Sequence, residues 1–220
     1  MNIALPQQID RRQWLRFLRV KGEPAQDLAA RMTEAEGLLL AAARPRGIYR
    51  VIPKEEAATE GISIRRHLEG CDQVAVMAVT LSTEIDQLIS RSQITNMALA
   101  VVLDTGASVL AEQAADSAEE ILRTELAAKL QGRFFTARFS PGYGDYPVHC
   151  QREILACVDA HRKIGITLTS GNMMVPHKSV TALIGMADHP VTGRLATCAE
   201  CVLREKCDAQ GERLCRFEEG

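Results

Sequence analysis

An arginine and a tyrosine frame a short segment in the second half of the chain, Arg138-Phe139-Ser140-Pro141-Gly142-Tyr143. The guanidinium of arginine presents a planar fork of donors that suits a carboxylate. The Pro-Gly turn lets a ligand approach the backbone, because glycine has no Cβ in the way, and the tyrosine carries a ring and a hydroxyl to the loop tip. A surface turn with a solvated arginine is the alternative, since such short patterns also occur by chance.

A group of cysteines ends the chain: Cys198, Cys201, Cys207 and Cys215 fall within 18 residues. A Cys-x2-Cys pair can chelate a metal from a single turn, and the other two need only short loops to close the site. The spacing predicts a metal or cluster site rather than unligated thiols. Four thiolates suit zinc and a [4Fe–4S] cluster equally. The other three cysteines are expected to be small buried apolar side chains: Cys71, Cys150 and Cys157.

Two further motifs have simpler interpretations. Asp104-Thr105-Gly106 matches the signature of retroviral-type aspartic proteases, but the residues that follow are alanine-rich and favour a helix. That protease chemistry needs two carboxylates that share a proton in an all-β fold, so it remains a remote alternative. Asp159-x-His161 resembles part of a cobalt-ligating signature, yet a basic helix C-terminus explains it better.

Hydrophobic periodicity predicts helices and strands in the following ranges. Helices are expected at 10–20, 24–43, 63–69, 83–131 and 148–161, with a possible break of the fourth near Ser92. Strands are expected at 47–53, 73–81, 133–139 and 181–187. This order predicts an α+β fold: one mixed α/β domain with an antiparallel-rich sheet packed on long helices, a helical N-terminal segment and a cysteine-rich C-terminal knob.

Composition excludes several classes of protein. The chain has 220 residues, 46% of them hydrophobic and 25% charged, as in ordinary soluble proteins. Its formal net charge of -2 argues against a general nucleic-acid binder. We find no run of about 18 apolar residues and no signal peptide at Met1–Pro6, so we expect no membrane span and a cytoplasmic protein with reduced cysteines.

The order of motifs along most of the chain resembles the activation domain of cobalamin-dependent methionine synthase, in a short free-standing form. The Arg-x-x-x-Gly-Tyr loop is followed by a helix, then by Ile164–Thr169, by Met173–Pro176 and by Lys178-Ser179-Val180-Thr181. Upstream, similar segments are Ile9–Arg12, Ala43–Arg46, Arg66–Cys71 and Val79–Leu81. The family's Leu-Thr-Glu-Ser is here Leu168-Thr169-Ser170-Gly171, which lacks the glutamate.

The resemblance implies that the loop binds S-adenosylmethionine through Arg138, Ser140, Pro141, Gly142 and Tyr143. It also implies that Arg138 holds the ligand's carboxylate and that Tyr143 faces the corrin, in a catalytic role. The cobalamin would be held by a partner methyltransferase, most simply methionine synthase, with flavodoxin or ferredoxin as a possible electron donor. The chain would then be an accessory subunit for reductive methylation of cob(II)alamin.

Three segments are expected: 1–60 as the helical N-terminal part, 61–195 as the ligand-binding core and 196–220 as the metal-binding tail. A second function stays open at this point. The chain could be a non-catalytic module that binds S-adenosylmethionine or a corrinoid protein, with structural zinc in the tail.

Overall fold

The computed structural model describes residues 1, 3–191 and 193. Contacts between residues divide the chain into two compact units. The first unit consists of Met1–Gly47, Val79–Ala118 and His161–Val180. The second consists of Ile48–Ala78, Glu119–Ala160 and Thr181–Gly220. The predicted tail site at Cys198, Cys201, Cys207 and Cys215 lies outside the described residues.

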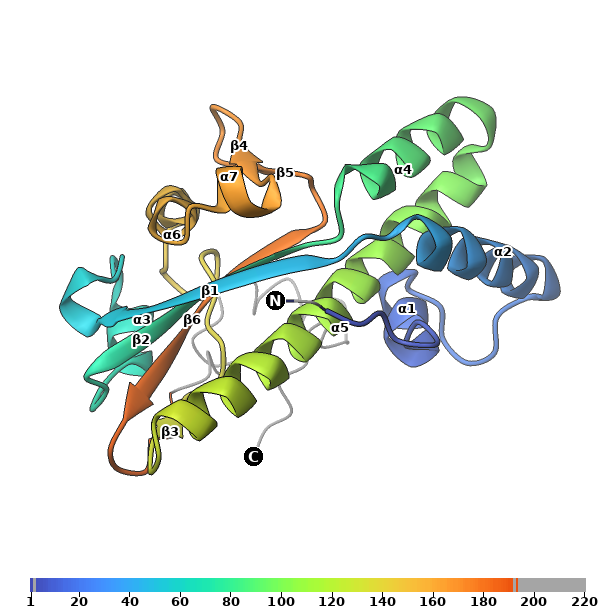
Figure 1. Cartoon of the computed structure of the whole chain (residues 1–220). Helices are drawn as coiled ribbons and strands as arrows, with labels where there is room; N and C mark the ends of the chain where they lie inside the picture. Colours follow the sequence, from blue (N-terminus) through green and yellow to red (C-terminus); the bar gives the residue numbers. More distant parts are fainter. Residues whose placement is uncertain (2, 192, 194–220) are drawn as a thin grey trace. The chain divides into compact units, whose positions relative to one another are not determined.

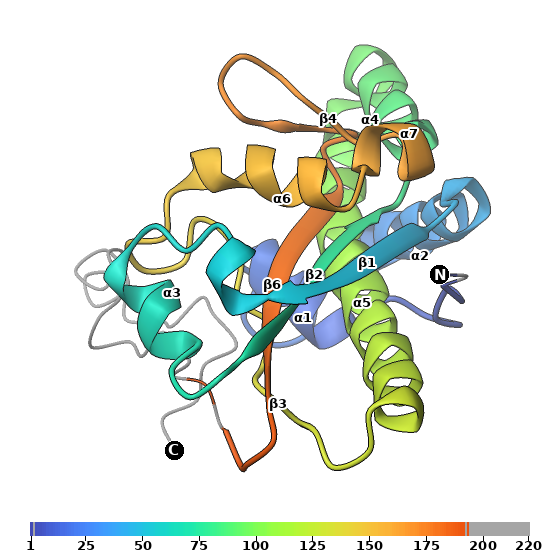
Figure 2. The same cartoon turned by 60° about the vertical axis from the view of Figure 1, so that its left-hand side comes forward.

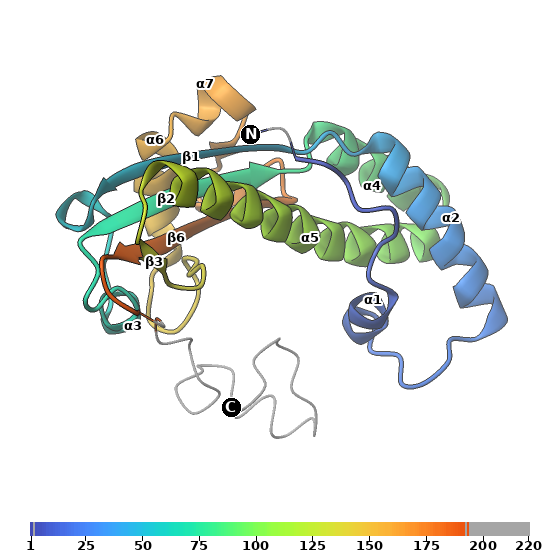
Figure 3. The same cartoon turned by 60° about the horizontal axis from the view of Figure 1, so that its bottom comes forward.

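Helices dominate the first unit: α1 (Arg11–Phe17), α2 (Gln26–Ala42), α4 (Thr83–Thr95) and the first part of α5 (Met97–Lys129). The chain reverses between α4 and α5, and α2 lies beside α4 (Figures 1 and 3). The reversal occurs at Asn96, whose side-chain oxygen accepts a hydrogen bond from the Leu99 amide at 3.1 Å. An asparagine cap of this kind starts a new helix, so the expected break lies at Asn96 rather than near Ser92.

Trp14 of α1 anchors the core of the first unit. Its side chain is fully buried, and its Nε1 donates to Thr105 Oγ1 at 3.0 Å and to the Val102 carbonyl at 3.2 Å. Gly106 makes this contact possible, since a Cβ there would lie 2.4 Å from Cζ2 of the indole ring. The tryptophan therefore packs directly on the backbone of α5.

A four-stranded sheet forms the centre of the second unit, in the order β1-β2-β6-β3. Its strands are β1 (Arg46–Pro53), β2 (Gln73–Thr80), β6 (Ser179–Ala187) and β3 (Phe134–Phe135). The first two residues of β1 and β6 and the last two of β2 belong to the first unit. Figure 2 shows β1, β2 and β6 side by side. The sheet is antiparallel, which confirms the predicted mixed α/β class with an antiparallel-rich sheet.

Helices cover both faces of this sheet. Tyr49 of β1 donates from its hydroxyl to Glu125 of α5 at 2.6 Å, whereas Arg50 donates to the Cys157 carbonyl of α6 (Gln151–Cys157) at 3.2 Å. Neighbouring residues of a strand point to opposite faces, so α5 and α6 lie on different sides. Consistent with this, β2 is buried along nearly its whole length, from Val74 to Thr80.

The remaining elements are short: η1 (Lys54–Glu56), α3 (Ile62–His67), η2 (Val148–Cys150), α7 (Ala160–Ile164), and the β4–β5 hairpin (Thr167–Leu168 and Met174–Val175). The single helix expected over 148–161 is thus divided into η2, α6 and α7. The break falls at Asp159, which adopts a positive φ of 54°, a left-handed conformation that a helix interior does not contain.

The sequence predicts no membrane span. Helix α5 is nevertheless long and apolar enough to cross a bilayer, by length and composition alone. Its apolar side chains are explained by packing, because Leu103, Ala107, Leu110 and Ala114 are all buried. A core helix of a folded domain shows this pattern as well.

Candidate functional site

The Arg138 loop leaves the sheet through a bulge. Phe134 and Phe135 pair with Ala187 and Met186, and pairing resumes at Phe139 opposite Leu183. Four steps from Phe135 to Phe139 therefore face three steps from Met186 to Leu183, so one extra residue is inserted. This is why the strand expected over 133–139 is only two residues long, with one isolated bridge after it.

A side chain fills the gap that the bulge opens in the ladder. The Thr136 hydroxyl accepts a hydrogen bond from the Gly185 amide at 2.8 Å, and the Thr136 amide donates to the Gly185 carbonyl at 3.0 Å. The buried backbone of β6 thus keeps its partners. The bulge turns the next residues out of the strand register and so sets the direction in which Arg138 leaves the sheet.

Arg138 is held by a carboxylate on α5. Its Nη1 lies 3.0 Å from Glu119 Oε2, and the two side chains are 14% and 17% exposed. The other oxygen of Glu119 accepts from Nε and Nη2 of Arg123 at 2.9 and 2.6 Å. Arg123 also donates to the Thr136 carbonyl. One carboxylate therefore joins two guanidinium groups and ties the start of the loop to the helix.

The four residues after Phe139 form a tight turn. The Tyr143 amide donates to the Ser140 carbonyl at 3.1 Å, and the Gly142 amide donates to the Tyr146 carbonyl at 2.8 Å. Gly142 has a φ of 96°, a left-handed conformation that favours glycine. Pro141 is buried, whereas Gly142 and Tyr143 are exposed. The turn thus presents its glycine and tyrosine to the surroundings.

Aromatic rings support the turn from behind. Phe139 is buried and packs on His67 at a centroid distance of 4.7 Å, while Tyr143 meets the same phenylalanine edge-on at 5.7 Å. The residue Tyr143 nevertheless stays 38% exposed. His67 is itself fixed, since its Nε2 donates to the Ala137 carbonyl at 2.8 Å. The exposed ring therefore stands on a rigid base.

Two residues after the turn fasten it to the start of α3 and to the segment before that helix. The Tyr146 hydroxyl donates to the Ala58 carbonyl at 2.6 Å, and burial raises the pKa of this phenol. The Asp145 carboxylate accepts from the Ile62 and Ser63 amides, each at 2.7 Å. These backbone donors lower the pKa of Asp145 to about 2, because they stabilise the ionised form.

The comparisons with known proteins agree with this architecture. A family model described as "Vitamin B12 dependent methionine synthase, activation domain" matches residues 62–192. The chain belongs to this family. Thirteen solved chains match its structure. One is the crystal structure of the MetH reactivation domain bound to AdoHcy, with a TM-score of 0.62 and 18% identity, covering 94% of this chain and 82% of that one. No curated protein matched in the sequence search.

Within this activation domain, the structure brings the five predicted loop residues together. One turn contains Ser140, Pro141, Gly142 and Tyr143. Arg138 lies just before this turn, separated from it by Phe139. The departure from the family pattern, Ser170-Gly171, lies in the exposed turn of the β4–β5 hairpin. The roles of the five loop residues in ligand binding stay predictions.

The protease alternative is wrong. Asp104, Thr105 and Gly106 lie in the interior of α5, and each has a packing role there. Lys178 Nζ binds Asp104 at 2.8 Å and Ser108 Oγ at 2.9 Å, and the Thr105 hydroxyl donates to helix carbonyls and accepts from Trp14. A helix interior cannot supply the β-turn that an aspartic protease carboxylate requires.

The basic helix end predicted at His161 is also found. His161, Arg162 and Lys163 belong to the last turn of the short helix α7, where positive charge is favourable.

Sequence reasoning missed the residues that hold the loop. The hydrogen bonds of Glu119, Asp145 and Tyr146 join residues that are 19 to 88 positions apart in the sequence. No local spacing predicts such contacts. Only the Glu119–Arg123 pair, four residues apart on one helix, follows a recognisable sequence rule.

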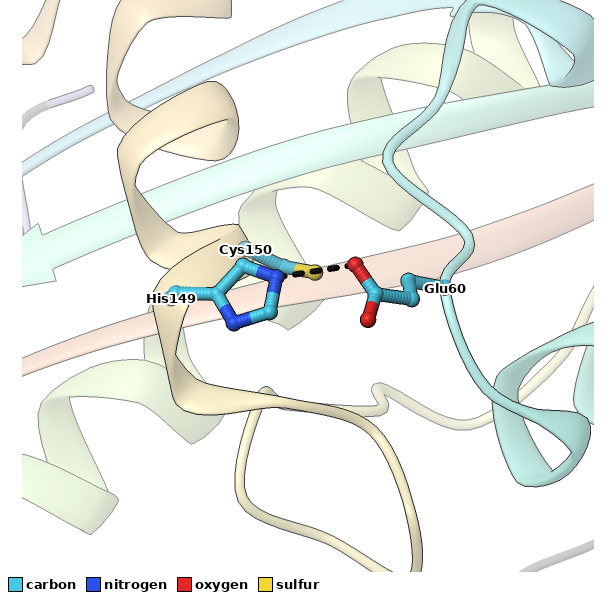
Figure 4. A group of neighbouring side chains, drawn as sticks. All are labelled: Glu60, His149 and Cys150. Carbon is cyan, nitrogen blue, oxygen red and sulfur yellow. Dashed lines mark hydrogen bonds and ion pairs between the residues drawn. The ribbon is translucent and has the colours of Figure 1, made fainter.

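Within the described part of the chain, one group of possible metal ligands converges in space: Glu60, His149 and Cys150. Figure 4 shows their side chains pointing toward one another from two separate segments. Burial raises the pKa of the Cys150 thiol, and the charges of Glu60 and Glu153 add to this effect. Cys71 is buried as expected, whereas Cys157 is only half-buried.

Proposed function

We propose that this activation domain binds S-adenosylmethionine on the Arg138 loop and supports reductive methylation of cobalamin held by a partner methyltransferase. The single observation that carries the proposal is the family match, which spans residues 62–192 and so includes the whole loop. The related reactivation domain was crystallised with AdoHcy, a molecule with the same amino-acid carboxylate and adenosine as S-adenosylmethionine.

Arg138 would bind the carboxylate of the ligand. Its guanidinium is largely buried and already restrained by Glu119, so little side-chain freedom remains to be lost on binding. A charge-assisted contact to a carboxylate suits this planar group. Ser140, Pro141 and Gly142 would provide the backbone against which the ligand lies, and the lack of a Cβ at Gly142 permits close approach.

Tyr143 would contact the partner methyltransferase when the two proteins bind. A tyrosine that is 38% exposed at the tip of a supported turn fits an interface anchor, since tyrosines buried at interfaces often dominate the binding energy. The cofactors supply the chemistry, namely one electron from a reductant and a sulfonium methyl group delivered to cobalt. The chain itself would supply position and orientation.

The partner class follows from the cobalamin-dependent family. We extend the proposal to methionine synthase as the methyltransferase, to flavodoxin or ferredoxin as the electron donor, and to the cytoplasm as the compartment. The C-terminal cysteines would hold zinc or an iron–sulfur cluster. Metal analysis and visible absorption of protein purified without air test the last point, and protein lacking both metals would refute it.

Calorimetry on the Arg138→Ala variant tests ligand binding. Loss of a charged partner should weaken S-adenosylmethionine binding by about 1.5–3 kcal/mol, or roughly tenfold to more than a hundredfold. The fold should survive, because Glu119 keeps Arg123 as a partner. Arg133→Ala is the matched control: Arg133 is 15% exposed and pairs with Asp72, so its loss should leave ligand affinity unchanged. Equal affinities of wild type and Arg138→Ala would refute the assignment.

A second measurement separates this function from a non-catalytic binding module. Wild-type protein is mixed with S-adenosylmethionine, a reductant and a methyltransferase carrying cob(II)alamin, and methylcobalamin is followed by absorbance. We expect conversion that depends on the protein. Tight ligand binding without any conversion would favour the binding module instead.

A further inference from the structure

We propose that Glu60, His149 and Cys150 form a binding site for one divalent cation of the zinc type. The candidate ligand atoms all lie within 4.8 Å of one another. His149 Nε2 is 2.8 Å from Glu60 Oε2. Donors around tetrahedral zinc lie about 3.3–3.8 Å apart, given bonds of about 2.0–2.3 Å. Small side-chain movements would therefore place the three ligand atoms at three corners of a tetrahedron around the ion.

The donor types select the metal. A thiolate, an imidazole and a carboxylate together suit a borderline-soft cation such as Zn²⁺, whereas Mg²⁺ and Ca²⁺ prefer oxygen alone. An ionised Cys150 and Glu60 would carry two negative charges, which match the charge of the ion. Three protein ligands leave the fourth position for water. This proposal does not rest on S-adenosylmethionine binding.

The two segments that carry the ligands are held together before any metal binds. Tyr146 hydrogen-bonds to the Ala58 carbonyl, and the Asp145 carboxylate accepts from the Ile62 and Ser63 amides. Such fixed ligands lower the ordering cost of binding.

Glycines allow this close approach. A Cβ on Gly61 would lie 2.8 Å from the Asp145 carbonyl oxygen, and one on Gly144 would lie 2.4 Å from Ser63 Oγ. Both have positive φ values, 110° and 55°, which glycine adopts at little cost. The backbone therefore sets the spacing between Glu60 and the His149-Cys150 pair.

Without metal, Glu60 can only accept, so the Nε2–H of His149 donates to it. Metal binding at Nε2 requires the tautomer with its proton on Nδ1. The Cys150 thiol must lose its proton to the solvent, so one proton is released for each ion bound. His149 and Glu60 are exposed, with side chains 53% and 63% accessible, so an ion can enter without unfolding the segment.

Cobalt(II) is the probe that tests the site, because a cobalt–thiolate bond gives a charge-transfer absorption. The experiment uses the full chain with the tail thiols removed by substitution: Cys198→Ser, Cys201→Ser, Cys207→Ser and Cys215→Ser. Titration without air should give the band at one cobalt per chain, and zinc should displace it. Absence of the band would refute the proposal.

Single substitutions in this background then identify the ligands. Cys150→Ser should abolish the thiolate band, whereas Cys157→Ser, a matched control on the adjoining helix α6, should retain it. Glu60→Gln neutralises an exposed carboxylate and His149→Ala removes an exposed imidazole, so both variants should keep the fold. Each should weaken cobalt binding by about tenfold or more, since even indirect partners of a metal contribute that much. Retention of the band in Cys150→Ser, or unchanged affinity in both exposed variants, would overturn the assignment.

Discussion

Asp104-Thr105-Gly106 and the segment from Arg138 to Tyr146 both contain residues that could do chemistry, yet the fold uses them differently. In the helix, the hydroxyl groups donate locally: Thr105 Oγ1 donates to the Val101 carbonyl at 2.9 Å and Ser108 Oγ to the Asp104 carbonyl at 3.1 Å, each four residues back. In the loop, Asp145 and Tyr146 bind groups 82 to 88 residues away. A hydroxyl on a helix can bond to a carbonyl one turn back, whereas these two loop side chains bond to a distant segment.

The two lysine and arginine contacts extend this comparison. Lys178 spans Asp104 and Ser108 on one face of α5 and so fastens the strand end to the helix. Arg138 is fastened to α5 as well, but it stands at the start of a turn that exposes a glycine and a tyrosine. Similar ion pairs therefore have different roles. The surrounding backbone determines which of the two belongs to a candidate site.

The largest expected effect tests the packing role of the helical motif. Gly106→Ala should lower the free energy of unfolding by about 2–3 kcal/mol, because the new Cβ would lie 2.4 Å from the Trp14 ring. This clash outweighs the gain of about 1 kcal/mol in helix propensity. Denaturant titration measures the change.

Gly37→Ala on α2 is the matched control. A Cβ there meets nothing within 4 Å, so the substitution should stabilise the protein by about 0.5–1 kcal/mol. If both variants were stabilised alike, the close packing of Trp14 on α5 would be contradicted.

The next effect concerns the exposed ring of the loop. Tyr143→Ala should keep S-adenosylmethionine affinity within a few-fold but slow methylcobalamin formation about tenfold or more, equivalent to roughly 1.4 kcal/mol. The reason is that Tyr143 would contact the partner rather than the small ligand. Calorimetry and absorbance are measured on the same preparation. Loss of ligand binding with normal turnover would reverse the assigned role, and no change in either would make Tyr143 an ordinary turn residue.

A smaller effect tests the distant hydrogen bond of the loop. Tyr146→Phe should destabilise the protein by about 1 kcal/mol, since the partly buried Ala58 carbonyl loses its donor. Tyr49→Phe also removes one hydroxyl donor, from a more exposed pair, and should cost less. Thermal unfolding of both variants compares them. A larger loss for Tyr49→Phe would argue that the Tyr146 contact does not hold the loop.

The smallest effect depends on pH. The folded pKa of Asp145 is about 2, below the usual value of about 3.9 in an unfolded chain. Its stabilisation is therefore present above pH of about 3.9 and is lost as the pH falls through 2. Asp145→Asn should reduce stability by less than about 1 kcal/mol at pH 6, because solvent screens this exposed carboxylate.

The difference between wild type and Asp145→Asn should shrink as the pH approaches 2. Denaturation midpoints at several pH values measure it. A difference that stays constant from pH 6 to pH 2 would show that the carboxylate charge plays no part.

The sequence by itself determined the longer helices and strands and which residues gather in the loop. Buried strands such as Val74–Val79 and the helices around Trp14 and Leu39 follow from apolar patterns, because burial imposes the period of each element on the sequence. The order Arg138-Ser140-Gly142-Tyr143 and its colinear neighbours also carried the family resemblance. Turn residues are local, so adjacent letters are enough to predict them.

Only the tertiary structure decided what the polar residues do. The bulge before Arg138, the contact of Arg138 with Glu119, and the meeting of Glu60 with His149 and Cys150 all depend on segments far apart in the chain. The same holds for Gly106, whose missing Cβ matters only because Trp14 packs there. Sequence patterns report local geometry and burial, whereas long-range pairs arise from the packing of whole elements, which no short spacing records.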